Sequence, residues 1–314
     1  MKVLQGLVLT FLAAGAASAQ TIGIVTTPAG SFSNSAGQAI AKVLVDKAKL
    51  RAVVQAQAST GFEEVESGSA DFNVSNSFDA TFFATGTGEY EGQGKHPVMR
   101  YVGALIPYRV AMHVRADSKI NSIADLRGKR VSSDFNAQKT IGRIIAAHLA
   151  NAGLGYSDVV KVPAPNVTRQ AEDFMSGKVD VMFFALGSAA IKQANASVGG
   201  LRVLEVDTAA GAMQRTEALI PGAYVIEVVP NPGIDGVSRP TRLIAFDMVM
   251  ITNAKTSDDV VYKLAKALHD NKQDLVATFP PFGLFQPQNM AKPLQGVELH
   301  PGAMKYYKEA GLLK

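Results

Sequence analysis

Apolar residues between positions 21 and 75 alternate between the spacing of strands and the spacing of helices. This spacing predicts strands at 21–25, 52–57 and 70–75, a helix from about Asn34, and a short helix around Glu63. The first helix carries Ile40, Val43 and Leu44 on one side. This strand–helix–strand–helix–strand order is typical of an open α/β sheet.

The same rhythm restarts after a long β-rich run at 101–115, which Pro107 is expected to interrupt. The pattern then predicts a helical turn and a strand over 122–131, a helix at 140–152, a strand at 159–162, a helix at 167–176 and a strand at 179–184. Farther along, a strand at 242–252 precedes a helix at 257–271, with Ser257 as its N-cap. Two α/β units with a restart between them predict a protein of two lobes.

Residues 1–19 have the layout of a secretory signal peptide. Lys2 supplies a positive start, residues 4–17 form an apolar run, and Ala17-Ser18-Ala19 offers small side chains to the signal peptidase. The run is shorter than the roughly 20 residues that a membrane-spanning helix needs, although an uncleaved anchor helix is the alternative. We therefore expect cleavage near Ala19 and a mature chain that works outside the cytoplasm.

Composition narrows the function classes. The 314 residues are 47% hydrophobic and 18% charged, which suffices for a folded core and, at this length, for two domains. There is no cysteine, which excludes disulfides, thiol catalysis and thiolate metal sites. The formal net charge of +4 is dispersed along the chain without interleaved aromatic residues, so nothing indicates nucleic-acid binding.

Several enzyme motifs are absent from the sequence. It contains no phosphate-binding G-x-x-x-x-G-K-[ST], no G-x-S-x-G nucleophile elbow and no Ser-x-x-Lys pair. Residues 86–92 miss the dinucleotide-binding fingerprint by one position, and a flexible loop is expected there. The five histidines share no metal-binding spacing and are expected to be packed or on the surface. We expect no catalytic residue, no metal site and no cofactor.

Two polar strand-to-helix turns, one in each expected lobe, are candidates for a ligand site. The first contains Ser31, Phe32 and Ser33, and the second contains Gln138, Lys139 and Thr140. A helix N-terminus offers unpaired N–H groups and a partial positive charge, which suit a carboxylate. Ordinary helix capping by these polar residues is the alternative.

Four further positions are candidates because of their places in the expected fold. Arg109 lies in the run that connects the lobes, where it is either a bidentate partner for an anion or a solvated strand-edge arginine. Asn76 and Ser77 follow the third strand, where open α/β sheets bind ligands, unless they form a simple turn. Gly187, after the strand at 179–184, completes the predicted ligand site. The aromatic residues expected in the core, with a floor for the ligand as the alternative, are Phe183, Phe184 and Phe282.

Five parts of the chain carry a family resemblance: Gly30-Ser31-Phe32 with Gly37, residues 114–118 with 124–131, residues 177–184, residues 258–268 and residues 300–307. Together they resemble the TAXI family, the extracytoplasmic solute-binding proteins of tripartite TRAP transporters. The resemblance covers nearly all of the mature chain. Many members have a Gly/Pro-rich turn where this chain has residues 134–139, so we expect side chains to line that half of the cleft.

The resemblance implies an α/β, bilobed type II periplasmic binding protein fold, with two α/β lobes joined by crossing hinge strands. On this basis we expect lobe I to comprise residues 20–112 and 245–314, and lobe II to comprise residues 113–244. Hinge motion would close the lobes on a small ligand and present the closed form to membrane partners.

The resemblance further implies a periplasmic receptor that delivers a small organic anion to a TRAP membrane permease. The two polar helix starts, with Arg109 and Lys139, suit a 2-oxo acid, a dicarboxylate or an acidic amino acid. A sensory subunit that signals to a membrane histidine kinase is the alternative. An enzyme on the same fold is a third possibility, which the lack of a nucleophile–base motif disfavours.

Overall fold

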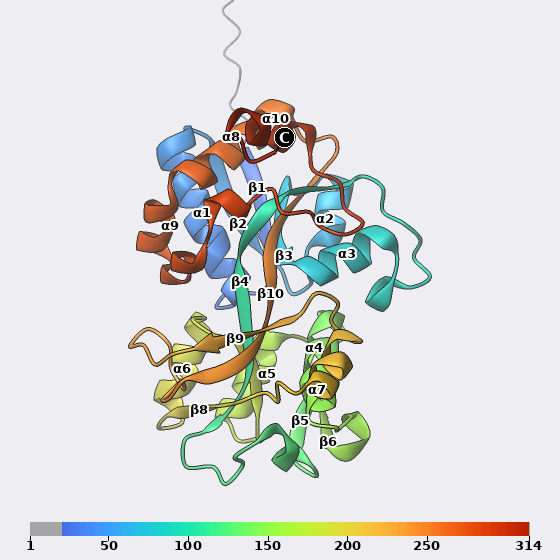
Figure 1. The fold of residues 1–314 in the computed structure, drawn as a ribbon, viewed down its shortest axis with the longest axis vertical. Coiled ribbons are helices and arrows are strands. Elements are labelled where there is room, and N and C mark those ends of the chain that lie inside the picture. The colour runs from blue at the N-terminus through green and yellow to red at the C-terminus, as the bar shows by residue number, and fades with distance from the viewer. Residues whose placement is uncertain (1–20, 314) are drawn as a thin grey trace, which may run out of the picture.

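The computed structural model describes residues 21–313 and shows two lobes stacked along the longest axis (Figure 1). The upper lobe in this view contains β1 (Thr21–Thr26), α1 (Phe32–Ala48), β2 (Arg51–Ala56), α2 (Phe62–Ser67), β3 (Phe72–Asn76), α3 (Ser77–Thr85), α8 (Asp258–Asp270), α9 (Lys272–Thr278) and α10 (Pro301–Glu309). The expected signal peptide lies outside the described residues. Within residues 21–313, no helix is both long enough and apolar enough to cross a membrane.

The lower lobe is built from the middle of the chain. It contains β5 (Arg130–Ser133), α4 (Lys139–Asn151), β6 (Val160–Pro163), α5 (Val167–Met175), β7 (Met182–Ala185), α6 (Ala189–Ser197), β8 (Leu201–Leu204), α7 (Ala210–Glu217) and β9 (Tyr224–Val228). Two long strands, β4 (Met99–Arg115) and β10 (Thr241–Asn253), run through both lobes (Figure 1). The expected α/β fold of two lobes joined by crossing strands is therefore confirmed, while the lobe limits at 112/113 and 244/245 stay a prediction.

Strand pairing departs from chain order, since β1 lies between β2 and β3, and β10 lies between β3 and β4. β1 pairs in parallel with both β2 and β3, because α1 and α2 return the chain to the same end of the sheet. β10 pairs antiparallel with β3 and β4, and β4 pairs antiparallel with β7 and β8. β5 and β6 form a separate parallel pair in the lower lobe. β4 and β10 thus tie the lobes together through backbone hydrogen bonds.

Pro107 does not interrupt β4, so this part of the sequence prediction is wrong. The strand continues on both sides of Pro107, which lies opposite Asp247 of β10. The register shifts between Asp247 and Val249, and such an irregularity tolerates a residue that has no N–H to donate. β4 therefore passes through the hinge as one element.

Helix α3 is missing from the sequence prediction, and the simple turn weighed for Asn76 and Ser77 is wrong. Asn76 is the N-cap of α3, and its Oδ1 accepts the backbone N–H of Asp79 at 2.9 Å. Phe78 and Phe83 are buried and Phe82 is partly buried, so apolar residues occupy several sides of the helix. This distribution hides the 3.6-residue period on which a helix prediction depends.

The other expected elements lie within a few residues of their predicted limits. α1 begins at Phe32 rather than near Asn34, and Ser257 occupies the N-cap of α8 without a side-chain capping bond. The three aromatic residues expected in the core, Phe183, Phe184 and Phe282, are each at most 2% exposed.

The contact between α8 and α10 leads to a stability prediction at Gly302. A Cβ added to Gly302 would lie inside contact distance of the carbonyl oxygen of Asp258. Gly302→Ala is therefore expected to lower the free energy of unfolding by about 3 kcal/mol in chemical denaturation, because the two helices must move apart. Gly155→Ala is the matched control, since its added Cβ would make only an ordinary contact, at 3.8 Å from Ser157. Equal stability of the two variants would contradict the tight helix packing.

Candidate functional site

The two lobes contact each other through polar bonds. The bonds are Ala190 N–H to the carbonyl of Gly30 at 3.3 Å, Thr140 Oγ1 to Asp79 Oδ1 at 2.6 Å, and an ion pair between Arg143 and Glu89 at 2.5 Å. Each bond joins an element of the upper lobe to α4 or α6 of the lower lobe. The first candidate turn, through Gly30, and helix α4, which begins at the second candidate turn, therefore both take part in contacts between the lobes.

The hydroxyl groups of the first turn bond to their own turn. Ser31 Oγ accepts the N–H of Asn34 at 3.2 Å and so caps α1. Thr27 Oγ1 lies 2.8 Å from Ser31 Oγ and 2.5 Å from Ser33 Oγ, and both serines are buried. Phe32 packs edge-on against Tyr108 and Phe279. The capping alternative thus describes Ser31, and a direct contact of Ser31, Phe32 or Ser33 with ligand stays a prediction.

The three candidate residues of the second turn differ in burial and in hydrogen-bond partners. Gln138 is buried, and its Oε1 accepts the N–H of Val167 at 2.8 Å. Lys139 is exposed, and Thr140 is buried with its hydroxyl on Asp79. Asp134, which opens the turn, has a positive φ of 53°, a conformation that costs energy for a residue with a Cβ. The turn is therefore held in shape mainly by bonds to the rest of the protein.

Asp79 is an interlobe residue that the sequence analysis did not identify. It is 1% exposed, and burial raises its pKa to about 7, against the opposing effect of the Thr140 and Tyr90 hydroxyls. Its only sign in the sequence is an acidic position in the first turn of a helix, which favourable interaction with the helix dipole explains equally well. Asp79 is buried by its contact with the other lobe, and residues nearby in the sequence give no sign of that contact.

Arg109 and Gly187, both predicted site residues, line one cavity of about 370 Å³ between the lobes. The cavity is bordered by β9 and residues 229–234 of the lower lobe and by the 3₁₀ segment η4 (Pro280–Leu284) of the upper lobe, and it opens to solvent. A Cβ on Gly187, which has a φ of +84°, would lie 2.9 Å from Pro281 of the other lobe. We call this space the Arg109 cavity.

Arg109 is the one candidate whose burial and bonding both point to a ligand. Its side chain is 9% exposed, and within residues 21–313 its guanidinium has no hydrogen-bond or ion-pair partner. Burial lowers the pKa of Arg109 from its usual value, yet a guanidinium stays protonated in proteins. The cavity therefore contains a positive charge that has no partner in residues 21–313, and an anion bound there would pair with it.

A cluster of aromatic rings lies beside the crossing strands. Tyr108 packs against Phe32 at 5.0 Å and against Phe246 of β10 at 5.3 Å between ring centroids, and Phe246 packs against Phe78 at 4.9 Å. Burial raises the pKa of Tyr108. Within the described part of the chain, the Tyr108 hydroxyl forms no hydrogen bond. This cluster joins α1, α3 and both hinge strands, so it couples the first candidate turn to the hinge.

Two further candidates, Lys139 and Ser77, line other cavities. Lys139 borders a space of about 420 Å³ together with Glu63 and Glu64 of the upper lobe, whose carboxylates would repel an anion. Ser77 borders a space of about 560 Å³ between α3 and residues 292–296. The structure thus brings Arg109 and Gly187 together and separates them from Lys139 and Ser77.

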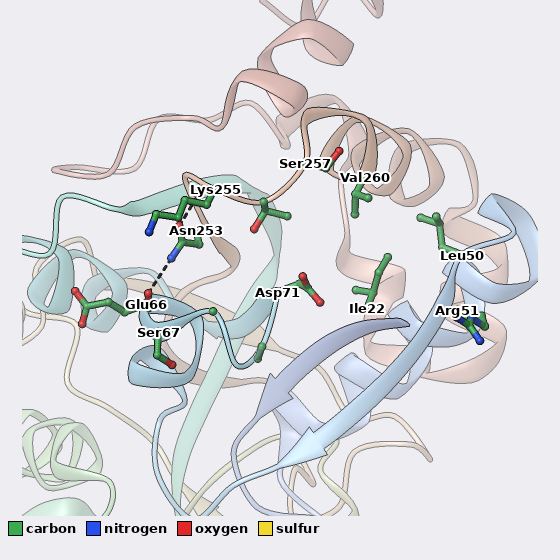
Figure 2. Close-up of a pocket in the computed structure, with 13 residues that line it drawn as sticks. Ile22, Leu50, Arg51, Glu66, Ser67, Asp71, Asn253, Lys255, Ser257 and Val260 are labelled. Carbon is green, nitrogen blue, oxygen red and sulfur yellow. Dashed lines mark hydrogen bonds between the residues drawn. The ribbon is translucent and has the colours of Figure 1, made fainter. Parts of the chain in front are cut away.

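Figure 2 shows a further cavity of about 380 Å³ on the upper lobe, where β1 and β2 begin and β10 ends. The Asp71 carboxylate accepts the N–H of Gly23 at 2.8 Å, and Glu66 bonds to His96 at 2.7 Å. Asn253 donates to the backbone carbonyl of Glu66 (Figure 2). Both carboxylates therefore have partners in the chain, and none of the predicted site residues lies here.

Two of the three fully buried histidines in residues 21–313 are packing residues of the lower lobe, and the third, His300, is the N-cap of α10 in the upper lobe. His113 and His148 are fully buried, and burial lowers the pKa of each to about 4, so both are neutral near pH 7. Across residues 21–313, no group of three His, Asp or Glu side chains is arranged to hold a metal ion.

Comparisons with known proteins agree on the fold. The periplasmic binding protein BugD matches with a TM-score of 0.61 and 15% identity, over 93% of this chain and 98% of BugD. AbpA of Streptococcus pneumoniae, an amino acid ABC transporter substrate-binding protein bound to L-arginine, matches with a TM-score of 0.52 and 13% identity, over 84% and 95% of the two chains. The VFT2 domain of Bordetella pertussis BvgS matches with a TM-score of 0.50 and 13% identity, over 83% and 93%.

These likenesses confirm the bilobed fold that is shared with periplasmic binding proteins. At the level of sequence, the family model described as the NMT1-like family matches residues 24–311, which is nearly the whole of the described chain. The chain therefore belongs to the NMT1-like family.

Proposed function

We propose that the protein is a periplasmic solute receptor that binds a small organic anion in the Arg109 cavity. The observation that carries this proposal is the Arg109 guanidinium, which lines this cavity and has no hydrogen-bond or ion-pair partner within residues 21–313. A carboxylate matches the planar guanidinium with two parallel hydrogen bonds, and it would compensate the charge. The cavity is bounded by both lobes, so binding there would favour the arrangement in which the lobes are in contact.

For the membrane partner, we propose the permease of a TRAP transporter. The support is the resemblance of five segments of the sequence to the TAXI family. In this role the protein performs no chemistry on its ligand, and the lobes present the bound anion to the permease. A TRAP permease gene beside the gene for this protein would support the transport role, whereas a histidine kinase gene alone would support a sensory one.

The proposal is tested by a thermal-shift screen of the purified protein after unfolding and refolding to remove any bound ligand. A ligand at 100 times its Kd stabilises the protein by about 2.7 kcal/mol. For a chain of this size the expected rise in Tm is roughly 5–10 °C. Small carboxylates are expected to produce it, and sugars and cationic amino acids are not.

Two variants test whether the rise in Tm comes from binding in the Arg109 cavity. Arg109→Gln is expected to abolish the shift, and Arg239→Gln, which removes an arginine that is 69% exposed and paired with Glu205, is expected to retain it. Shifts from sugars or cationic amino acids with silence from every carboxylate would contradict the proposed anion receptor.

A further inference from the structure

The walls of the Arg109 cavity are mostly apolar. Ile226 and Val228 of β9, Ile234 of the following loop, and Pro280, Pro281 and Leu284 of η4 all border the space. Such walls contribute affinity by removing apolar ligand surface from water. A ligand that fits this cavity therefore has an apolar body next to its charged group.

Arg109 is the single cation of the cavity lining in the described structure. The other ionisable residue of the lining, Glu227, is exposed and lies opposite Arg242 in the β9–β10 ladder. Asn231 has its Oδ1 engaged with the N–H of Gly233 at 2.8 Å. A second carboxylate on the ligand would thus find no second cation, and it would be repelled by Glu227.

The cavity has the volume of a small-molecule site. It measures about 370 Å³ and opens to solvent, and a volume in this range accommodates a small organic acid.

From the single cation, the apolar walls and this volume, we propose that the ligand is a monocarboxylate with a short, branched or cyclic apolar body, rather than a dicarboxylate or an acidic amino acid. The inference rests on the proposed function and narrows the class of anion. The carboxylate pairs with Arg109, and the apolar body lies against Ile226, Leu284 and the two prolines.

The test is calorimetric titration of the refolded protein with probes of similar size. The set comprises 4-methylpentanoate and phenylacetate as monocarboxylates, 4-methylpentanamide as the neutral counterpart, and glutarate and glutamate as dicarboxylates. At least one monocarboxylate is expected to bind about thirtyfold or more tightly than the amide, because the amide leaves the buried guanidinium without a counter-charge. The same monocarboxylate is expected to bind more tightly than glutarate or glutamate.

Variants of the cavity wall distinguish the contribution of apolar contact to ligand affinity from the contribution of the charge. Ile226→Ala and Ile226→Asn are each expected to weaken the monocarboxylate about tenfold, since they remove apolar contact area. Val53→Asn, at a side chain that is 48% exposed in the upper lobe, is the control and is expected to change nothing. Circular dichroism of each variant verifies folding, and the two substitutions at Ile226 guard against the misfolding of one.

The outcomes distinguish this inference from the proposed function. Tighter binding of glutarate or glutamate than of every monocarboxylate would overturn the inference and leave an anion receptor in place. Equal binding of the amide and the acid, or binding of no carboxylate of either class, would overturn both.

Discussion

Asp79→Asn is expected to raise the free energy of unfolding at pH 8 by about 4 kcal/mol and to leave it nearly unchanged at pH 4. Burial between the lobes raises the folded-state pKa of Asp79 from its ordinary value of 3.8 to about 7. Between these values the folded protein holds a proton that the unfolded chain has released, so stability falls as the pH rises. The difference of about three pKa units corresponds to about 4 kcal/mol.

The pH window follows from the direction of the shift. The contribution of protonated Asp79 is fully present below about pH 4 and is lost as the pH rises to about 7. Glu89 and Glu63 add to the rise in the pKa of Asp79 through charge repulsion. Asn keeps a carbonyl oxygen to accept the Thr140 hydroxyl, so the substitution removes the titration while retaining the acceptor.

Denaturant titrations from pH 4 to pH 8 measure this effect as the difference between variant and wild type. The difference isolates Asp79 from other carboxylates, such as Asp180 and Glu205, whose pKa values are lowered by arginine partners and whose contributions have the opposite slope. Glu91→Gln, at an exposed carboxylate of the same lobe, is the control. Parallel pH profiles for wild type and Asp79→Asn would show that Asp79 is not buried as a neutral acid.

Arg109→Met is expected to stabilise the ligand-free protein by about 1–3 kcal/mol while abolishing stabilisation by anions. Removal of a partly desolvated charge that has no partner relieves a desolvation penalty, and Met retains much of the side-chain volume. Guanidinium chloride unfolding, with and without a bound carboxylate, measures both effects. The gain in stability without ligand and the loss of ligand stabilisation together identify a binding residue. Replacement of a residue with a structural role would lower the free energy of unfolding both with and without the carboxylate.

The control for this prediction is Arg239→Met, since Arg239 is exposed and paired at the surface with Glu205. Exposed ion pairs contribute little, so its unfolding curve is expected to follow that of the wild type with and without ligand. A clear loss of stability in ligand-free Arg109→Met would indicate that the guanidinium supports the fold, and the Arg109 cavity would then lose its main argument.

Local periodicity made most elements of the fold predictable. The alternation of short apolar runs with helical spacing placed β1 to β3, and the amphipathic pattern of residues 258–270 placed α8 within a residue. Where several sides of an element are buried, the period is lost, as in α3. Pro107 shows the converse case, since a residue that usually breaks a strand is tolerated beside an irregularity that only strand pairing creates.

The candidate site was predictable only in part, because burial depends on segments that are far apart in the sequence. The sequence analysis identified Arg109 from its place in the run that connects the lobes and Gly187 from its place after the strand at 179–184, and the two residues line one cavity. Residue type alone could not distinguish Arg109 from Lys139, because what sets them apart is that the folded chain buries Arg109 and leaves Lys139 exposed. The sequence analysis missed Asp79 because the helix dipole alone accounts for an acidic residue in the first turn of a helix. Its contact with Thr140 of α4 leaves no sign in the nearby sequence.

The sequence by itself thus determined the α/β alternation, the crossing segments and the polar turns, since each depends on residues that are close along the chain. Only the tertiary structure decided which charged groups lose their water and which of them find a partner. Burial is set by segments far apart in sequence, as in the bond between Thr140 and Asp79, which are 61 positions apart. The energetic consequences of Arg109 and Asp79 therefore arise when the lobes meet.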